Sequence, residues 1–293
     1  MRWEGNRESD NVDDVRNQGG GPGGGLRLGG GRLGIGSVVI ALVASYFLGV
    51  NPLTVLQMLA GGPAPVSQPA VEQPGTAPQN DEQTRFVRTV LADTEDVWRT
   101  LFKEGGGQYQ DPRLVLFRGS VPTACGTGQS AMGPFYCPAD QKVYIDLGFY
   151  DVLRQQLGAP GDFAQAYVIA HEVGHHVQNL LGTTDKVDAM RGRVSETQYN
   201  ALSVRLELQA DCYAGVWAHH ADRARQVLET GDIEEGLNAA ARIGDDALQR
   251  QAGGEVRPDS FTHGTSVQRQ TWFRRGLDTG DLRQCDTFAR GAV

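Results

Sequence analysis

The chain has 293 residues, of which 27 are Lys or Arg and 35 are Asp or Glu, so its formal net charge is −8. This balance excludes the strongly basic composition of a nucleic-acid-binding protein, whose affinity depends on neutralising phosphates, and we expect no nucleic-acid partner. With 40% hydrophobic and 21% charged residues, the chain can build a sizeable core, which excludes wholesale disorder.

The first 80 residues divide into three segments of different composition. Residues 1–32 are polar and then rich in glycine, so they cannot bury enough apolar area to offset their backbone entropy, and we predict a disordered tail. Residues 33–50 carry no charge, and as a helix they would span about 27 Å, close to the ~30 Å hydrocarbon core of a bilayer. We predict a transmembrane anchor there, followed by a linker rich in Pro and Gly over 51–80.

Flanking charges predict the orientation of this anchor. Arg16, Arg27 and Arg32 precede it, and no Lys or Arg follows it before Arg85. The excess of positive charge on cytoplasmic flanks then predicts a single-pass protein of the cell membrane, with a cytoplasmic N-terminus and an extracytoplasmic domain. A cleaved signal peptide and a buried core helix remain as alternatives for this segment.

Residues 81–293 have the composition of one globular domain. Apolar positions at helical spacing predict a helix over 85–102, and short apolar runs predict strands at 114–117 and 143–147. After residue 160 the pattern is almost wholly helical. The expected fold class is therefore α+β, mainly helical with a small sheet, preceded by one transmembrane helix.

Four cysteines are present: Cys125, Cys137, Cys212 and Cys285. Outside the cytoplasm an even number favours disulfides, although the sequence permits three pairings. We favour Cys125 with Cys137 and Cys212 with Cys285. A cysteine-rich zinc site is the weaker alternative, because the chain has no CxxC pair.

A helix is predicted over 162–182, with Asp162 as its N-terminal cap and Gly182 ending it in a left-handed conformation. Within it residues 171–175 read HEVGH. Residues four apart share one helix face, so His171 and His175 can bind one metal ion, with Glu172 beside them. Zinc lowers the pKa of its bound water to about 7, and a carboxylate can take that proton as the water attacks a carbonyl. The alternative is a solvated helix with histidines placed by chance.

A second helix is expected to supply the third ligand. The metzincin continuation of HExxH is excluded, because the positions that it requires hold Gln178 and Leu181. A capping box at Ser195 opens a predicted helix that runs to about residue 223, on which Glu207 and Asp211 share a face. We expect Glu207 to bind the metal and Asp211 to accept the outer N–H of a ligand histidine. An ordinary amphipathic helix with surface carboxylates is the alternative.

Small residues favour close contact between these two helices. Gly174 in a helix interior costs about 1 kcal/mol relative to Ala, which indicates that another backbone packs against that turn. Ala210, Ala214 and Gly215 flank the two carboxylates on the second helix. His263, in a turn before a helix predicted over 268–275, is a candidate donor to the oxyanion, or else a plain turn residue.

Four motifs carry a family resemblance: HEVGHHVQN at 171–179, ELQADCYAGVWA at 207–218, and the longer patterns at 133–150 and 259–288. On these motifs, residues 81–293 resemble the bacterial neutral zinc metallopeptidase family, membrane-anchored relatives within the zincin group. The resemblance implies a zincin-like architecture and a Zn²⁺ site on His171, His175 and Glu207. It also implies that Glu172 is the general base.

The sequence therefore predicts a membrane-anchored bacterial zinc metallopeptidase that hydrolyses peptide or protein substrates with a zinc-activated water. Two other classes remain as alternatives. One is a catalytically inactive zinc-binding scaffold or binding protein of the envelope, and the other is an envelope protein in which the two helices only pack. The physiological substrate, the oligomeric state and any latency mechanism are not predicted.

Overall fold

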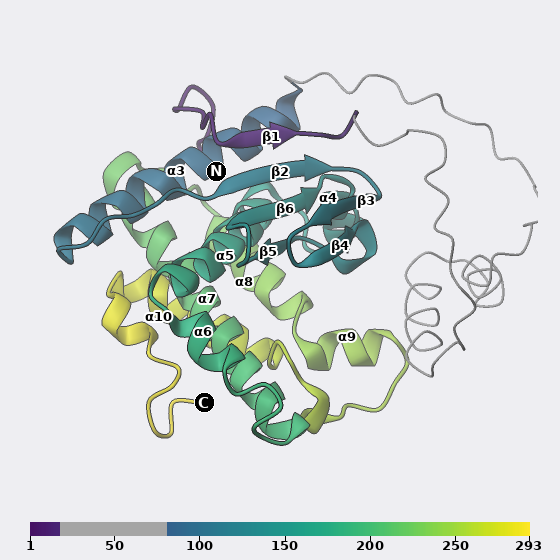
Figure 1. Cartoon of the computed structure of the whole chain (residues 1–293). Helices are drawn as coiled ribbons and strands as arrows, with labels where there is room; N and C mark the ends of the chain where they lie inside the picture. The colour runs from purple at the N-terminus through teal and green to yellow at the C-terminus, as the bar shows by residue number, and fades with distance from the viewer. Residues whose placement is uncertain (18–80) are drawn as a thin grey trace, which may run out of the picture. The chain divides into compact units, whose positions relative to one another are not determined.

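The computed structural model describes residues 1–17 and 81–293. One compact unit comprises Met1–Val15 and Pro78–Val293, and the other unit, Arg16–Ala77, lies almost entirely outside the described residues. Within the described part the fold is α+β, mainly helical with a small sheet, as predicted (Figure 1).

The main sheet has four strands in the order β1-β2-β6-β5. Their bounds are Val12–Asp14 for β1, Arg113–Phe117 for β2, Phe135–Cys137 for β5 and Lys142–Asp146 for β6. The strands β1, β2 and β6 are parallel to one another, while β5 runs antiparallel to β6. A separate hairpin joins β3 (Ser120–Thr123) to β4 (Gly126–Gln129).

Alternation along β2 and β6 gives the sheet two covered faces. Leu114 lies opposite Val143 in the register, and both belong to the large core that the helices complete. Val115 and Tyr144 point the other way, into a smaller apolar cluster that includes Val121 of the hairpin. Both faces are apolar because each is packed against another element.

Helix α5 (Asp162–Leu180) is the centre of the core, with the sheet on one side and other helices on the other (Figure 1). The remaining helices are α3 (Glu82–Glu104), α4 (Gly148–Gln155), α6 (Thr183–Asp188), α7 (Glu196–Arg225), α8 (Asp232–Arg242), α9 (Asp245–Gln251) and α10 (Ser266–Thr279). Short 3₁₀ segments are η1 (Ser130–Met132), η2 (Pro258–Ser260) and η3 (Leu282–Cys285).

The local signals for the helix ends are partly confirmed. Ser195 and Gln198 form the predicted capping box at the start of α7. Gly182 has the left-handed conformation expected after α5. Asp162, however, is the first residue of α5 and not its cap, because Gly161 occupies the capping position with φ 122°.

Glycines let α7 approach two neighbouring helices closely. A Cβ on Gly174 would lie 3.0 Å from the Ala210 carbonyl oxygen, which confirms the expected contact between α5 and α7. Gly215 instead faces α10, since a Cβ there would lie 2.1 Å from the Phe273 carbonyl oxygen. At these two glycines the backbones of α5 and α10 therefore pack directly against the backbone of α7.

The two disulfides have the favoured pairing. Cys125 joins Cys137 of β5 across 12 residues, and Cys212 of α7 joins Cys285 of η3 across 73 residues. The second bond ties the C-terminal segment to the helix that carries Glu207.

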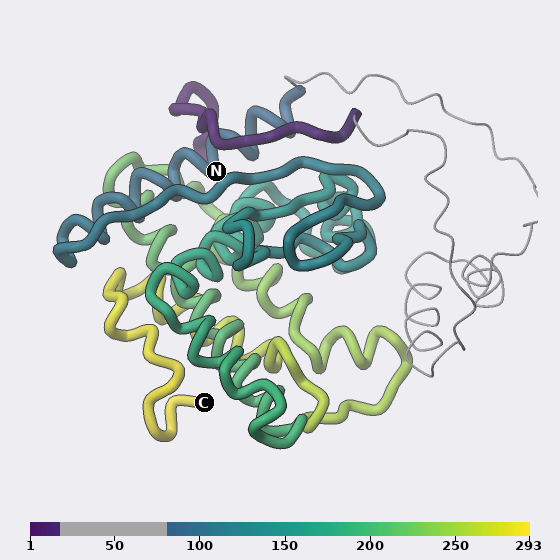
Figure 2. The backbone as a smooth tube through the Cα atoms, in the orientation of Figure 1, coloured from purple at the N-terminus to yellow at the C-terminus, as the bar shows by residue number. Residues whose placement is uncertain are grey.

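The folded unit contains residues 1–15, which corrects the disordered tail predicted over 1–32. Strand β1 lies beside β2 (Figure 2) and pairs with it, Val12 opposite Leu114. Trp3 packs edge-on against the ring of Phe86 on α3. The prediction averaged composition over the whole segment, so its glycines outweighed a short stretch with three buried apolar side chains, Met1, Trp3 and Val12. The rest of that segment lies outside the described residues.

The predicted membrane topology is also wrong. Across residues 1–17 and 81–293 we find no helix with the length and apolar character needed to cross a membrane. A single crossing at 33–50 would put the N-terminal segment and the domain on opposite sides, yet Met1–Val15 and Pro78–Val293 fold as one unit. We therefore drop the transmembrane helix from the fold class and the single-pass localisation with it. The segments 33–50 and 51–80 themselves lie outside the described residues.

Candidate metal centre

Three predicted ligands meet where α5 and α7 pack together. His171 Nε2 is 3.2 Å from Glu207 Oε2, and His175 Nε2 is 3.4 Å from Glu207 Oε1. One donor atom from each residue lies within 4.8 Å of the other two. The i, i+4 spacing puts both imidazoles on one face of α5, and the close approach at Gly174 brings the Glu207 carboxylate to them.

This donor set fits zinc. Zinc binds imidazole nitrogen and carboxylate oxygen at about 2.0–2.2 Å in a tetrahedral arrangement, so two of its donors stand about 3.3–3.5 Å apart. The two distances from histidine nitrogen to Glu207 oxygen, 3.2 and 3.4 Å, are close to that donor–donor separation. The side chains of His175 and Glu207 are 19% and 18% exposed, so one side of the cluster is open to a further ligand.

The outer nitrogen of His171 faces a buried carboxylate. Nδ1 lies 2.9 Å from Asp211 Oδ1, and Asp211 is fully buried. Burial opposes its ionisation, but the charge of Arg269 outweighs this and lowers the pKa of Asp211 to about 2. Because an ionised carboxylate can only accept, Nδ1 carries a hydrogen, and Nε2 is the ring atom left for a metal ion, which would replace its hydrogen.

Asp211 is itself held by two buried side chains that the sequence analysis did not single out as site residues. Arg269 of α10 donates to both carboxylate oxygens, and the Tyr167 hydroxyl donates to Oδ1. A buried carboxylate is usually paired with a cation, so a buried Asp211 predicts a nearby Lys or Arg. The sequence alone does not say which arginine faces inward.

The outer nitrogen of His175 has a neutral partner. Its Nδ1 lies 2.9 Å from Gln178 Oε1, one turn further along α5. The i, i+3 spacing was a usable signal, since it places the two side chains next to each other on the helix. In the sequence, Gln178 serves only to exclude the metzincin pattern.

Glu172 is buried beside the ligands, with 7% of its surface exposed. Burial raises the pKa of Glu172, although the charges of His171 and His175 partly oppose the shift. Among the described residues, no donor is hydrogen-bonded to its carboxylate, so its oxygens are free to accept a proton.

Glu207 is charged in this setting. Burial opposes ionisation of Glu207. The charges of His175 and His263 and the hydrogen bond to His171 outweigh burial and hold the pKa of Glu207 well below its usual range. Burial likewise opposes protonation of His171, and the Asp211 carboxylate outweighs it, which raises the pKa of His171 to about 9.

His263 lies in the turn before α10, with its side chain about half exposed. Its Nδ1 is 3.1 Å from Asp245 Oδ1, and its main-chain N–H donates to Asp245 Oδ2 over 2.6 Å. Burial opposes protonation, but the charge of Glu207 and the bond to Asp245 raise the pKa of His263. His263 is therefore electrostatically coupled to the ligand cluster, and its role as an oxyanion donor stays a prediction.

His176 does not belong to the ligand cluster. It is fully buried and lies 2.9 Å from the Tyr136 hydroxyl and 2.7 Å from the Gln110 carbonyl oxygen. These bonds fasten α5 to the edge strand β5 and to the loop before β2.

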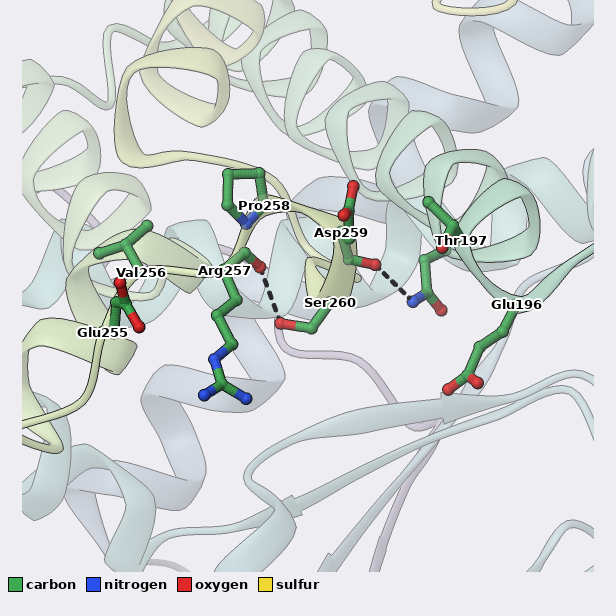
Figure 3. Close-up of a pocket in the computed structure, with 9 residues that line it drawn as sticks. Glu196, Thr197, Glu255, Val256, Arg257, Pro258, Asp259 and Ser260 are labelled. Atoms are coloured by element: carbon green, nitrogen blue, oxygen red, sulfur yellow. Dashed lines mark hydrogen bonds between the residues drawn. The ribbon is translucent and has the colours of Figure 1, made fainter.

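Two other features do not contribute to the centre. Asp162, Asp232 and Glu235 also gather carboxylate oxygens, but the Met1 amine binds Asp162 there over 2.7 Å. An open pocket of about 510 Å³ lies at the start of α7 (Figure 3). It is lined by Glu196, Thr197, Asn200, Glu255, Val256, Arg257, Pro258, Asp259 and Ser260, all exposed or half-buried and none of them in the ligand cluster.

Comparisons with known proteins agree with the chemistry of this donor set. The model of the family described as "Putative neutral zinc metallopeptidase" matches residues 1–288. The chain is 54% identical over 296 residues to the uncharacterized protein YpfJ of Escherichia coli K12, covering 99% of each chain. It is 43% identical over 224 residues to the uncharacterized protein Rv2575 of Mycobacterium tuberculosis H37Rv, covering 71% of this chain and 73% of that protein. No solved structure gives a significant match.

Proposed function

The chain belongs to the neutral zinc metallopeptidase family, and from this premise we propose that it hydrolyses peptide bonds at a zinc site formed by His171, His175 and Glu207. The observation that carries the proposal is the convergence of three donors from two helices at distances that suit zinc. Peptide or protein is the substrate class that a metallopeptidase of this family would take.

Each ligand histidine is oriented by its own acceptor. Asp211 and Gln178 accept from the outer nitrogens of His171 and His175, which leaves both Nε2 lone pairs for the metal. Glu207 supplies the negative charge. Loss of a hydrogen-bond partner of a metal ligand typically lowers metal affinity by about 10- to 100-fold. Asp211 and Gln178 should therefore strengthen zinc binding.

Zinc bound here would polarise the scissile carbonyl and lower the pKa of a water molecule at the open position. Glu172 accepts the proton from the attacking water and later delivers it to the leaving amine. Its burial raises the pKa of Glu172 and so its affinity for that proton, while the charges of the two histidines partly oppose the shift. His263, whose pKa the charge of Glu207 raises, is a candidate donor to the negatively charged oxygen that develops on the carbonyl.

The test uses the full chain, because Met1–Val15 belongs to the folded unit. We expect about one zinc per chain and chelator-sensitive cleavage of a peptide library. Glu172→Gln is expected to keep the metal and lose hydrolysis, because the amide cannot take a proton. Asp185→Asn is the matched control, since it removes one exposed carboxylate from α6 without touching the centre.

Three outcomes separate the proposal from its alternatives. Full activity in Glu172→Gln would refute the general-base assignment. Stoichiometric zinc without cleavage of any peptide would favour a zinc-stabilised scaffold. Absence of zinc binding by the wild-type chain would leave the two helices with a packing role only.

A further inference from the structure

A chain of side-chain amides leads away from the second histidine. His175 Nδ1 lies 2.9 Å from Gln178 Oε1, and Gln178 Nε2 donates to Gln209 Oε1 over 3.2 Å. Gln209 Nε2 then donates to the main-chain carbonyl oxygen of Cys285 over 3.0 Å. Gln178 Nε2 also donates to the Leu206 carbonyl oxygen over 2.7 Å. We call these bonds the amide relay.

Main-chain carbonyls fix the direction of every bond in the relay. A carbonyl oxygen can only accept, so the NH₂ group of Gln209 must face Cys285 and that of Gln178 must face Leu206. The oxygen of each amide is then turned the other way. Gln178 Oε1 therefore faces His175, and because this oxygen also only accepts, Nδ1 of the ring must carry the hydrogen.

Burial makes this direction hard to reverse. Gln178 is fully buried and Gln209 is 6% exposed, so bulk water does not replace a lost partner. Turning either amide over would set two donors or two acceptors against each other. The order of the hydrogen bonds is thus determined from the Cys285 carbonyl to the imidazole.

We propose that Gln178 and Gln209 are positioning residues that hold His175 in the tautomer with hydrogen on Nδ1, so that Nε2 keeps a lone pair for the metal. The proposal rests on the zinc site proposed above. A neutral imidazole without this restraint can carry its hydrogen on Nε2, where it blocks binding. Neither glutamine belongs to the ligand cluster.

The end of the relay is anchored to the helix that carries Gln209. Cys285 is bonded to Cys212, three residues after Gln209 on α7. Arg205 of the same helix donates to the Thr287 carbonyl, and the Thr287 hydroxyl donates back to the Arg205 carbonyl. The accepting carbonyl is therefore held at a constant place relative to α7.

The test compares Gln178→Met with Gln165→Met in the full chain. Both changes remove an amide from α5, but Gln165 donates only to the Gly161 carbonyl and lies outside the relay. We expect Gln178→Met to weaken zinc binding by about 10- to 100-fold in competition with a chromogenic chelator, and Gln165→Met to leave it unchanged. Gln209→Met should cost less than about 10-fold, because the Leu206 carbonyl still orients Gln178.

A second readout reports the tautomer directly. Ring ¹⁵N resonances of His175 in the zinc-free protein should show hydrogen on Nδ1 in the wild type and a mixture of tautomers in Gln178→Met. Gln178→Glu keeps an acceptor for Nδ1, and its second oxygen, which faces the Leu206 carbonyl, can donate only as a protonated carboxyl group. In that buried, neutral form it should retain the wild-type tautomer and bind zinc more tightly than Gln178→Met.

Failure of the relay and failure of the proposed function are distinguishable. If the wild-type chain binds no zinc, the proposed function fails while the ring resonances still test the relay. If the wild type binds zinc and Gln178→Met binds it as tightly with an unchanged tautomer, the relay is overturned. Equal zinc affinities for Gln178→Met and Gln178→Glu would also overturn it.

Discussion

Arg269 donates from Nε and from Nη2 to the two carboxylate oxygens of Asp211, each over 2.9 Å, with both residues almost completely buried. The pair joins α10 to α7, and its carboxylate reaches His171 in turn. The two histidines of the centre are therefore supported differently: His171 by a buried ion pair and His175 by neutral amides.

Removal of Arg269 should affect stability and metal binding together. Arg269→Met leaves the Asp211 carboxylate buried without its cation, which typically costs about 3–5 kcal/mol in the free energy of unfolding. We also expect weaker zinc binding, because the carboxylate that holds His171 is no longer fixed. The double variant Arg269→Met/Asp211→Leu should recover much of the stability but not the zinc affinity. Urea unfolding and chelator competition measure the two effects.

Arg225 provides the matched control for this prediction. It donates to the buried Asp93 over 2.7 Å and so forms a similar pair between α7 and α3, away from the ligands. Arg225→Met should lose stability and keep zinc affinity. If Arg269→Met lowers zinc affinity no more than Arg225→Met does, Arg269 has only a structural role.

Features with local signals could be predicted from the sequence. The capping box at Ser195, the four-residue spacing within α5 and the glycine at 174 each depend on neighbours a few residues away. Together they were enough to place His171, His175 and Glu207 on two helices that touch.

Long-range features could not be predicted in this way. Strand β1 has three residues and pairs with a strand about a hundred residues later. It is too short to show the alternating hydrophobic pattern that predicts a strand. Arg269 is one of three arginines on α10, with Arg274 and Arg275, and only the rotation of that helix decides which one is buried. The amide relay ends on a main-chain carbonyl, which carries no side-chain signal at all.

Alanine substitutions at two glycines should differ sharply in their cost. A Cβ on Gly276 would lie 2.0 Å from the Cys212 carbonyl oxygen, whereas a Cβ on Gly174 would lie 3.0 Å from that of Ala210. Overpacking costs about 1–3 kcal/mol or more, and the gain in helix propensity from Gly to Ala returns about 1 kcal/mol. We expect a net loss of about 1 kcal/mol for Gly174→Ala and of about 3 kcal/mol or more for Gly276→Ala.

Urea unfolding of the two variants checks this order, with Gly107→Ala as the control. A Cβ on Gly107 meets its nearest atom at 3.6 Å, an ordinary contact. That variant should stay within about 0.5 kcal/mol of the wild type. Equal stabilities for Gly276→Ala and Gly107→Ala would contradict the close helix contact between α7 and α10.

The two disulfides should contribute unequally. The bond between Cys212 and Cys285 closes 73 residues and that between Cys125 and Cys137 closes 12. The chain-entropy model then gives about 4 kcal/mol for the first bond and about 3 kcal/mol for the second. Replacing both cysteines of each pair by serine and measuring unfolding under non-reducing conditions tests this order.

Zinc affinity separates the two bonds further. Loss of the Cys212–Cys285 bond should weaken zinc binding, because the Cys285 carbonyl ends the amide relay, although the contacts between Arg205 and Thr287 limit the loss. Loss of the other bond should leave zinc affinity unchanged. The same zinc affinity in both double variants would mean that the C-terminal segment holds its place without the bond.

Acid should loosen the turn that carries His263. Asp245 Oδ2 accepts from the main-chain N–H groups of Thr262, His263 and Gly264 over 2.8, 2.6 and 2.9 Å. Burial opposes ionisation of Asp245, but these bonds and the His263 side chain outweigh it and lower the pKa of Asp245. Since the folded pKa lies below the unfolded value of about 3.9, the stabilisation is present above that pH and is lost as the pH falls through the folded pKa.

Hydrogen exchange of the Thr262, His263 and Gly264 amides measures this effect. Wild-type protection should fall as the pH drops below about 4, whereas Asp245→Asn should show low protection throughout with little further dependence on pH. Asp246→Asn is the matched control, because Asp246 binds the main-chain N–H of Ser266 instead. Protection of the three amides that is the same in Asp245→Asn and Asp246→Asn would show that the carboxylate does not hold the turn. His263 would then be free to move relative to Glu207, and its place as an oxyanion donor would lose its structural basis.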